Sequence, residues 1–224
     1  DALIDLIDGA DAYDLSWSQS EARLESRMMV GWFDTNSPRD AVAAAARDWG
    51  MSPAVVSRWL RESEGMDCGI TVNRDFSSFR LYSHGWGKAE PGTPGTVVYK
   101  GFKALADGSV RVDEYLHGGD LTDPDNLAFA LAHCRFPQWV DAVAGLARDV
   151  GEPIPFTRIS NPGRSSWLAT VRHCDVDAKL VSPDLVGRRL AHIAGGVDAT
   201  KGPFDSFYIS ASPGMVRSFL GVES

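Results

Sequence analysis

Cysteine is scarce in this chain, and long apolar runs are absent. Three cysteines occur among 224 residues, Cys68, Cys134 and Cys174, which are too few and too scattered for a disulfide framework. They favour buried thiols in a reducing compartment, so a cytoplasmic location is expected. No apolar run approaches the roughly 18 residues that a membrane-spanning helix needs, and no membrane span is expected.

An excess of positive charge is also lacking. The chain has 22 Lys and Arg against 30 Asp and Glu, a formal net charge of -8. This balance excludes a cationic surface over the whole protein, although a local basic patch for nucleic acid remains open. His133-Cys134 and His173-Cys174 are adjacent pairs without the spacing of metal ligands. Neither a metal nor another cofactor is expected.

The chain does contain a repeated alternation of helix-forming and strand-forming segments. Two helices are predicted over 37–50 and 52–64, each opened by a Ser-Pro pair and separated by a glycine. The turn signals "NRD", "ADG" and "NPG" each lie between segments rich in β-branched and aromatic residues, which predicts three hairpins. A further helical stretch is predicted from residue 123, with Pro137 interrupting it.

The C-terminal third of the chain has one further helix signal and one further hairpin signal, and the N-terminal residues have no clear pattern. "SPDLVGRRLAHIAGG" has a Ser-Pro start and a Gly-Gly end, which predicts a helix. "FDSFYISASPGMVRSFLGV" is interpreted as a fourth hairpin around "PG". The first 20 residues are acidic and weakly patterned, and "RLESRMMVGWF" is ambiguous between helix and strand.

This pattern favours an antiparallel sheet, because single strands do not alternate with helices as they do in βαβ units. We expect an α+β fold in which antiparallel β-hairpins alternate with helices, and eight strands could close into a β-barrel with the helices outside. The expected organisation is an N-terminal segment over 1–36 and a single α+β domain over 37–224. The alternative is a helix-turn-helix over 17–64 followed by an effector domain over 68–224.

The stretch "RDAVAAAARDWGMSPAVVSRWLRE", residues 39–62, resembles a DNA-binding helix-turn-helix. Its second helix would present residues to a DNA groove, namely Ser52, Ala54, Val55, Arg58 and Arg61. Two helices packed on a sheet across a glycine need the same small and apolar residues. The mixed charge of the stretch and its long first helix make nucleic-acid binding the disfavoured interpretation.

Polar and aromatic residues alternate along two predicted strands that end in "SHG" and "LHG". Because side chains alternate on a strand, one face of each carries such residues: Arg80, Tyr82 and His84 on the first, and Arg111, Asp113, Tyr115 and His117 on the second. Such a face is either solvated or the lining of a cavity. Arg and Lys there would bind an anionic ligand, and Tyr faces would stabilise a cation.

The rhythm of these elements resembles that of the ABBA aromatic prenyltransferases. "GMDCGITVNRDFSSFRLYSHG" is similar to that family's strand-turn-strand, and "SPDLVGRRLAHIAGGVDATKGPFDSFYISAS" is similar to its last helix and strand pair. The resemblance covers about half of the chain and implies a barrel of antiparallel hairpins. It also implies diphosphate-binding residues (Arg80, Lys100, Lys103 and Arg111), residues that shield an allyl cation (Tyr82, Tyr99 and Tyr115), and a residue that orients the acceptor or takes its proton (Asp113 or Glu114).

The function that this resemblance implies is a metal-independent transfer from a prenyl diphosphate donor to an aromatic acceptor. We therefore expect an anionic small-molecule substrate. His84, His117 and Trp86 are expected to bind it as well. Trp86 lies between glycines in a loop that could act as a lid. The alternatives are a helix-turn-helix transcriptional regulator with a ligand-binding domain, and a non-catalytic small-molecule binding module.

Overall fold

The computed structural model describes residues 2–20, 24–33, 37–85, 94–105, 107–161, 163–199 and 202–221. Within these residues, ten antiparallel strands close into a single barrel, with each strand paired to its neighbours in chain order and β1 paired to β10. The strands are β1 (Ala12–Ser20), β2 (Leu24–Trp32), β3 (Asp67–Asn73), β4 (Phe79–His84), β5 (Val97–Ala104), β6 (Val110–Asp120), β7 (Pro155–Asn161), β8 (Arg164–Thr170), β9 (Leu190–Asp198) and β10 (Gly202–Ser210).

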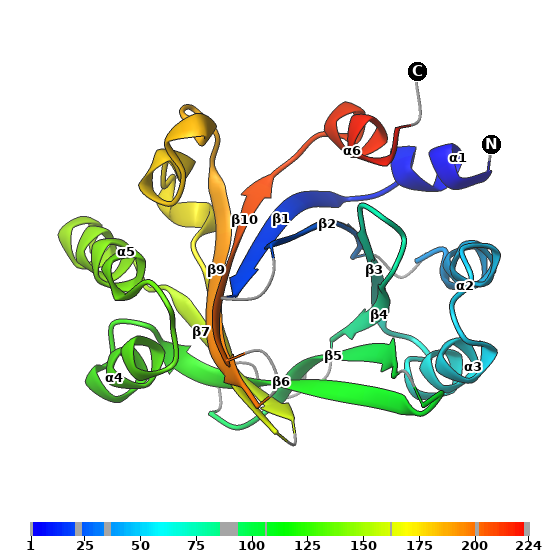
Figure 1. Ribbon diagram of the computed structural model, residues 1–224, viewed down its shortest axis with the longest axis horizontal. Helices are drawn as coiled ribbons and strands as arrows, with labels where there is room; N and C mark the ends of the chain where they lie inside the picture. The colour runs from blue at the N-terminus through cyan, green and yellow to red at the C-terminus, as the bar shows by residue number, and fades with distance from the viewer. Residues whose placement is uncertain are drawn as a thin grey trace.

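The helices lie outside the barrel and surround it (Figure 1). They are α1 (Ala2–Asp8), α2 (Arg39–Asp48), α3 (Pro53–Glu62), α4 (Pro124–Ala132), α5 (Pro137–Val150) and α6 (Pro213–Leu220). Figure 1 shows α2 and α3 on one side of the barrel and α4 and α5 on the opposite side. The fold class expected from the sequence is therefore confirmed, including closure of the barrel.

The hydrophobic core is a shell between the helices and the outer face of the barrel. Alternate residues of β2 and β3 are buried there, including Met28, Val30, Ile70 and Val72. The residues between them point inward, and many are polar. Successive side chains of a strand point to opposite faces. The same strand therefore carries apolar residues on the outer face of the barrel and polar residues on the inner face.

The up-and-down strand order gives the barrel two different ends. The strands β1, β3, β5, β7 and β9 all finish at one end, which we call the hairpin end because each continues directly into the next strand. The connections that carry the helices lie at the opposite end, which we call the helix end. Long connections at one end are where binding residues commonly gather.

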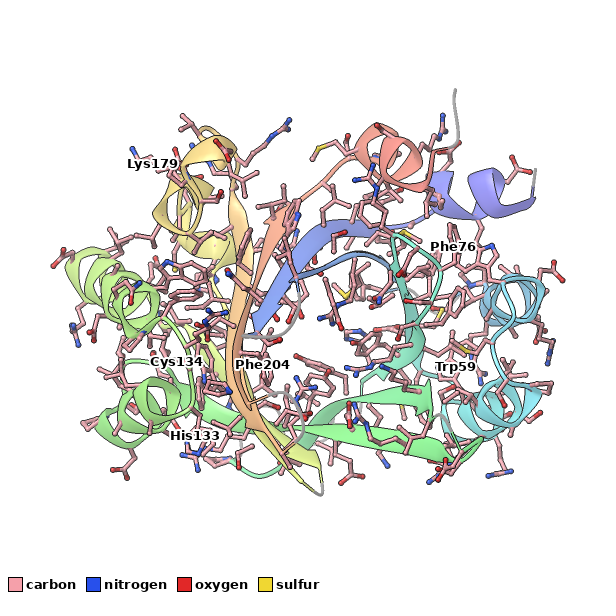
Figure 2. The ribbon with its side chains drawn as sticks, viewed as in Figure 1. Trp59, Phe76, His133, Cys134, Lys179 and Phe204 are labelled. Carbon is pink, nitrogen blue, oxygen red and sulfur yellow. The ribbon has the colours of Figure 1, made fainter. Side chains whose placement is uncertain are left out.

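The segment 39–62 forms α2 and α3, as predicted, with Gly50 between them at a φ of +85°. Val55 and Trp59 are fully buried in the outer core, and Trp59 Nε1 donates a hydrogen bond of 3.0 Å to the main-chain oxygen of Tyr82. Figure 2 shows Trp59 between α3 and the barrel. Arg58 is paired with Glu62 at 2.7 Å. A face that reads DNA would need Val55 to be exposed, and here it is buried. The two helices therefore pack against the outer face of the barrel.

Three sequence interpretations need correction. "SPDLVGRRLAHIAGG" is not a helix: it contains a short 3-10 turn, Pro183–Leu185, and then enters β9. The "PG" near the C-terminus opens α6 and is not a hairpin turn. The barrel has ten strands in place of eight because residues 12–32 form β1 and β2. The boundary at residue 36 thus falls between two parts of the same barrel.

Candidate functional site

The interior of the barrel holds a cavity of about 500 Å³. Its wall is built from inward-facing residues of nine strands, from β1 and β2 and from β4 through β10. A cavity of this size suits a small organic ligand. The polar groups on its wall decide which chemistry it can support.

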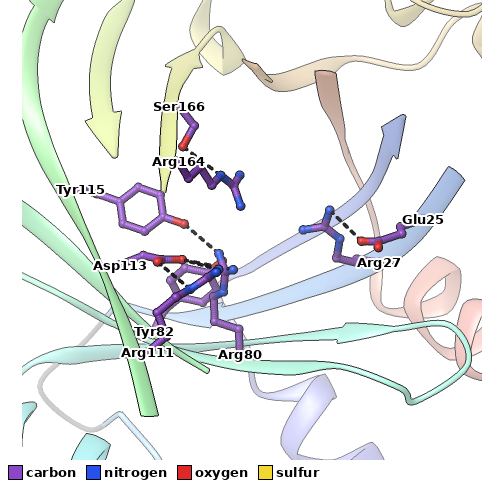
Figure 3. A network of polar contacts seen from close by, with 9 residues as sticks. All are labelled: Glu25, Arg27, Arg80, Tyr82, Arg111, Asp113, Tyr115, Arg164 and Ser166. Carbon is purple, nitrogen blue, oxygen red and sulfur yellow. Dashed lines mark hydrogen bonds and ion pairs between the residues drawn. The ribbon is translucent and has the colours of Figure 1, made fainter. Parts of the chain in front are cut away.

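A cluster of guanidinium groups and a carboxylate lies at one wall of the cavity (Figure 3). Arg80 Nη2 lies 3.2 Å from Asp113 Oδ2, and Arg111 Nε lies 3.0 Å from Asp113 Oδ1. Arg80 Nη1 also donates hydrogen bonds to the hydroxyl oxygens of Tyr82 and Tyr115, at 3.3 and 3.2 Å. Asp113 is almost completely buried, so this is an ion cluster inside the barrel.

Gly101 makes room for this cluster. It lies on β5 between Tyr82 of β4 and Asp113 of β6 in the strand register. A Cβ atom at Gly101 would lie 3.0 Å from Arg80 Cδ and 3.1 Å from Tyr82 Cε1. The absence of a side chain therefore lets Arg80 and Tyr82 cross β5 and reach β6.

Two further arginines face the same space, Arg27 of β2 and Arg164 of β8 (Figure 3). Arg27 lies 3.5 Å from Glu25. Arg164 donates a hydrogen bond to Ser166 and stacks on Phe204 at 4.4 Å from the ring centroid, and no described carboxylate forms an ion pair with it. Burial lowers the pKa of Arg164, yet a guanidinium remains charged at neutral pH.

Aromatic rings form a continuous series along the wall next to Arg80. Tyr115 stacks on Tyr99 with ring centroids 4.1 Å apart, and Tyr99 stacks on His84 at 5.1 Å. Tyr82 meets Tyr115 edge to face at 6.1 Å. Tyr208 lines the cavity from β10. The cavity thus offers ring faces directly beside guanidinium groups.

Burial fixes the protonation of these groups. It raises the pKa of Tyr99, Tyr115 and Tyr208, which are neutral phenols at pH 7. Burial opposes the charge of Arg80, but Tyr82, Tyr115 and Asp113 outweigh it and raise the pKa of that guanidinium. Burial lowers the pKa of His84 to about 4, so its imidazole is neutral.

A second polar cluster lies toward the helix end of the cavity. Asp14 of β1 is fully buried, and its Oδ1 accepts a hydrogen bond of 2.7 Å from Arg172 Nη2. Its Oδ2 has no hydrogen-bond partner among the described residues and lies 3.7 Å from His192 Nε2. His192 Nδ1 lies 3.2 Å from Thr170 Oγ1. A carboxylate oxygen beside an imidazole at a cavity wall can accept a hydrogen bond or a proton from a ligand.

The structure brings together only some of the residues that the sequence singled out. Five of them line the cavity: Arg80, Tyr82, His84, Tyr99 and Tyr115. Asp113 and Arg111 join them through the ion cluster. Lys103 lines a small space of about 30 Å³ that shares Arg27, Arg80 and Tyr82 with the cavity.

Four of the expected site residues lie elsewhere or outside the described residues. Lys100 and Glu114 point away from the cavity, since they alternate with the inward Tyr99 and Tyr115, and they pair with each other at 3.1 Å. His117 is half-buried and is not among the described residues that line the cavity. Trp86 and the expected lid lie outside the described residues.

Sequence reasoning missed the other residues of the cavity wall, among them Asp14, Arg27, Arg164, His192 and Tyr208. Three of them, Asp14, Arg27 and His192, lie in strands that the sequence pattern does not predict. A signal was present in "YDLSWS", where polar residues alternate with apolar ones. That period-2 pattern is typical of strands with one polar face.

Among the described residues, no group of three or more His, Cys, Asp or Glu side chains is arranged to hold a metal ion. The described helices also include none that is both long enough and apolar enough to cross a membrane.

Comparison with solved structures identifies the fold. The 5-dimethylallyl tryptophan synthase from Streptomyces coelicolor, solved in complex with DMASPP and Trp, superimposes with a TM-score of 0.59 at 14% identity, covering 90% of this chain and 79% of that one. The fold is that of the ABBA-type aromatic prenyltransferases. Prenyltransferase PriB, in a ternary complex with L-tryptophan and dimethylallyl thiolodiphosphate, matches with a TM-score of 0.55 at 12% identity, covering 90% of this chain and 80% of that one.

A third similar structure is AnaPT from Neosartorya fischeri, with a TM-score of 0.52 at 10% identity over 91% of this chain and 78% of that one. No family model matches the sequence, and no curated protein matches it either. At such low identities the likeness to the prenyltransferases concerns the fold.

Proposed function

We propose that this protein is a metal-independent transferase that moves a prenyl group from a prenyl diphosphate to an aromatic acceptor inside the barrel. The observation that carries the proposal is the cavity wall, which combines four guanidinium groups with four tyrosine rings. The tyrosines are Tyr82, Tyr99, Tyr115 and Tyr208; three of the arginines are Arg27, Arg80 and Arg164, and the fourth, Arg172, is paired with Asp14. Such a wall matches a reactant with an anionic end and an end that becomes cationic.

The arginines provide the positive charge that the leaving diphosphate needs. As the allylic carbon–oxygen bond of the donor breaks, its electron pair goes to the diphosphate, and negative charge grows on that group. Arg27, Arg80 and Arg164 face the space where it would develop, and guanidinium forks match phosphate oxygens. This is the physical reason to expect turnover without a divalent cation.

The tyrosines protect the other half of the donor. The allyl cation that remains is stabilised by aromatic ring faces and destroyed by water. Tyr99 and Tyr115 stack at 4.1 Å and are neutral, so they offer ring faces without acting as nucleophiles.

The cluster at Asp14 suits the acceptor. When an aromatic carbon forms a bond to the allylic carbon, that ring carbon must then lose its proton. Asp14 Oδ2 lacks a hydrogen-bond partner among the described residues and lies beside His192, so it can hold an N–H or O–H of the acceptor, and the pair can take up the released proton. We prefer Asp14 to Asp113 for this step because two arginines already occupy Asp113, and to Glu114 because that side chain faces outward.

The proposal is tested by incubating the protein with dimethylallyl or geranyl diphosphate and a panel of indoles and phenols, in the presence of EDTA. Mass spectrometry should detect an acceptor that has gained one prenyl group. Arg164→Gln should reduce the yield by about tenfold or more, since it removes an anion-binding group, while Arg148→Gln on the exposed part of α5 should not. Turnover that disappears in EDTA would contradict a metal-independent reaction.

The same cavity also fits a non-catalytic binding module, and one comparison separates the two functions. A binding module would raise its melting temperature with prenyl diphosphates through mass action and yield no product with any acceptor. A transferase would show both the stabilisation and the product.

A further inference from the structure

Asp113 pairs with guanidinium groups that an anionic ligand would need. Its Oδ2 lies 3.2 Å from Arg80 Nη2, and it receives two contacts from Arg111, 3.0 Å from Nε to Oδ1 and 3.2 Å from Nη2 to Oδ2. The carboxylate therefore binds Arg111 through both of its oxygens and Arg80 through one. A phosphate group would present oxygens of the same charge and spacing to the same guanidinium forks.

The two arginines differ in their access to the cavity. Arg80 lines it, whereas Arg111 is not among the described residues that do so. Arg111 thus pairs with Asp113 away from the cavity, whereas Arg80 contacts both Asp113 and the ligand space. An incoming anion reaches Arg80 from the cavity and competes with Asp113 for its guanidinium.

We propose that Asp113 is a built-in counter-ion of the anion site, which a bound diphosphate displaces from Arg80. The inference rests on the proposed function and gives Asp113 a role other than that of a proton acceptor. In the empty barrel the carboxylate offsets the cost of burying two guanidinium groups. In the ligated barrel its charge repels the phosphate, so diphosphate is bound weakly enough to leave after the reaction.

The direct test is calorimetric titration of the full chain with inorganic diphosphate. Asp113→Asn keeps the shape of the side chain and removes its charge, so it should tighten diphosphate binding by about tenfold or more, the effect of a nearby charge that shifts a pKa by one unit. Asp149→Asn makes the same change of charge at an exposed position on α5 and should leave the affinity unchanged. Unchanged or weaker binding by Asp113→Asn would overturn the inference.

A double variant separates competition between Asp113 and diphosphate for Arg80 from the effect of the net charge of the cluster. Asp113→Asn with Arg111→Gln removes one negative and one positive charge, so the net charge of the cluster is preserved while Arg80 is released. The counter-ion role predicts that this variant still binds diphosphate more tightly than the wild type. An affinity equal to or below that of the wild type would show that Asp113 does not compete for Arg80.

Separate controls address misfolding of the variant and failure of the proposed function. If Asp113→Asn fails to fold by circular dichroism, Asp113→Ser provides a smaller neutral side chain, and arginine Nε NMR of the wild type provides a readout without substitution. The signal that Arg80→Lys removes should shift on addition of diphosphate, and a diphosphate-bound protein with that signal unmoved would overturn the inference. A wild type that binds no diphosphate at all would instead contradict the proposed function.

Kinetics distinguish this role from that of a base. A counter-ion variant should show stronger product inhibition by diphosphate, which a variant that lacks only a base would not show. A loss of the single-turnover rate with unchanged diphosphate affinity would identify Asp113 as a proton acceptor and reject the counter-ion role.

Discussion

At the scale of single residues, Tyr115 separates the effect of a ring face from that of a hydroxyl group. Its ring stacks on Tyr99 while its hydroxyl accepts a hydrogen bond from Arg80. We expect Tyr115→Phe to keep most of the turnover number and Tyr115→Leu to lose about tenfold, because only the second change removes the face that stabilises an allyl cation. Rates at saturating donor and acceptor measure this. Equal losses in both variants would mean that the ring face plays no part.

His84 makes stability depend on pH. Burial lowers its pKa from 6.5 to about 4 in the folded protein, so between these values the unfolded chain binds a proton that the folded chain does not. The stabilisation from the neutral imidazole is complete above pH 6.5 and is lost as the pH falls toward 4, by about 3 kcal/mol.

The measurement is the free energy of unfolding in urea at pH 7 and pH 4. We expect His84→Phe, which keeps a ring beside Tyr99, to lose less stability over this interval than the wild type does. His173→Phe changes an exposed histidine and should follow the wild type. A His84→Phe curve parallel to the wild type would contradict the assignment.

The candidate site could be predicted from the sequence only where strand assignment was correct. Arg80, Tyr82 and His84 were placed on one face because "RLYSH" follows a clear turn signal, and all three line the cavity. Lys100 was included on charge alone, although it alternates with the inward Tyr99 and pairs with Glu114 on the outer face. Residue type suggests chemistry, but the parity of a position along a strand decides which side of the wall it reaches.

At the scale of elements, α3 packs on the outer face of the strand whose inner face lines the cavity. Trp59 fills the outer core and donates a hydrogen bond to the main chain of Tyr82, whose side chain lines the cavity. We expect Trp59→Phe to reduce the free energy of unfolding by about 1–3 kcal/mol, through the lost hydrogen bond and the smaller ring. Trp49→Phe, at a half-exposed ring beside Phe76 and Phe79, should cost less. Urea denaturation of both variants measures the difference, and the reverse order would contradict this view of α3.

The elements that were misassigned share a physical cause. "LAHIAGG" contains good helix formers and ends in two glycines, yet it forms β9 because its neighbours on the sheet override local propensity. Gly195 is needed there for close packing, since a Cβ atom would lie 2.7 Å from Asp205 Oδ1 and 2.9 Å from the oxygen of His133. Figure 2 shows His133 outside the barrel on the side of β9. A glycine required by tertiary packing looks, in the sequence, like the end of a helix.

At the scale of the whole molecule, the barrel inverts the usual placement of polar residues. The polar side chains of β1, such as Asp14 and Ser16, are buried inside, while Leu15 faces the outer core. A strand of this kind looks half-solvated in the sequence, although both of its faces are covered. This is why the pattern of helices and hairpins predicted the outer architecture, whereas the first two strands required the structure.

Closure also means that the barrel cannot be divided at residue 36. A fragment of residues 37–224 lacks β1 and β2, so β3 and β10 would each lose a partner strand and part of the outer core would be exposed. We expect this fragment to unfold without a cooperative transition in urea, because a sheet with two long open edges is both less stable and prone to aggregation. A fragment of residues 10–224 keeps all ten strands and loses only α1 and the turn after it, so it should retain a transition of slightly lower midpoint. Circular dichroism in urea measures both. A cooperative transition of the 37–224 fragment would show that the N-terminal hairpin is an accessory to a domain that closes without it.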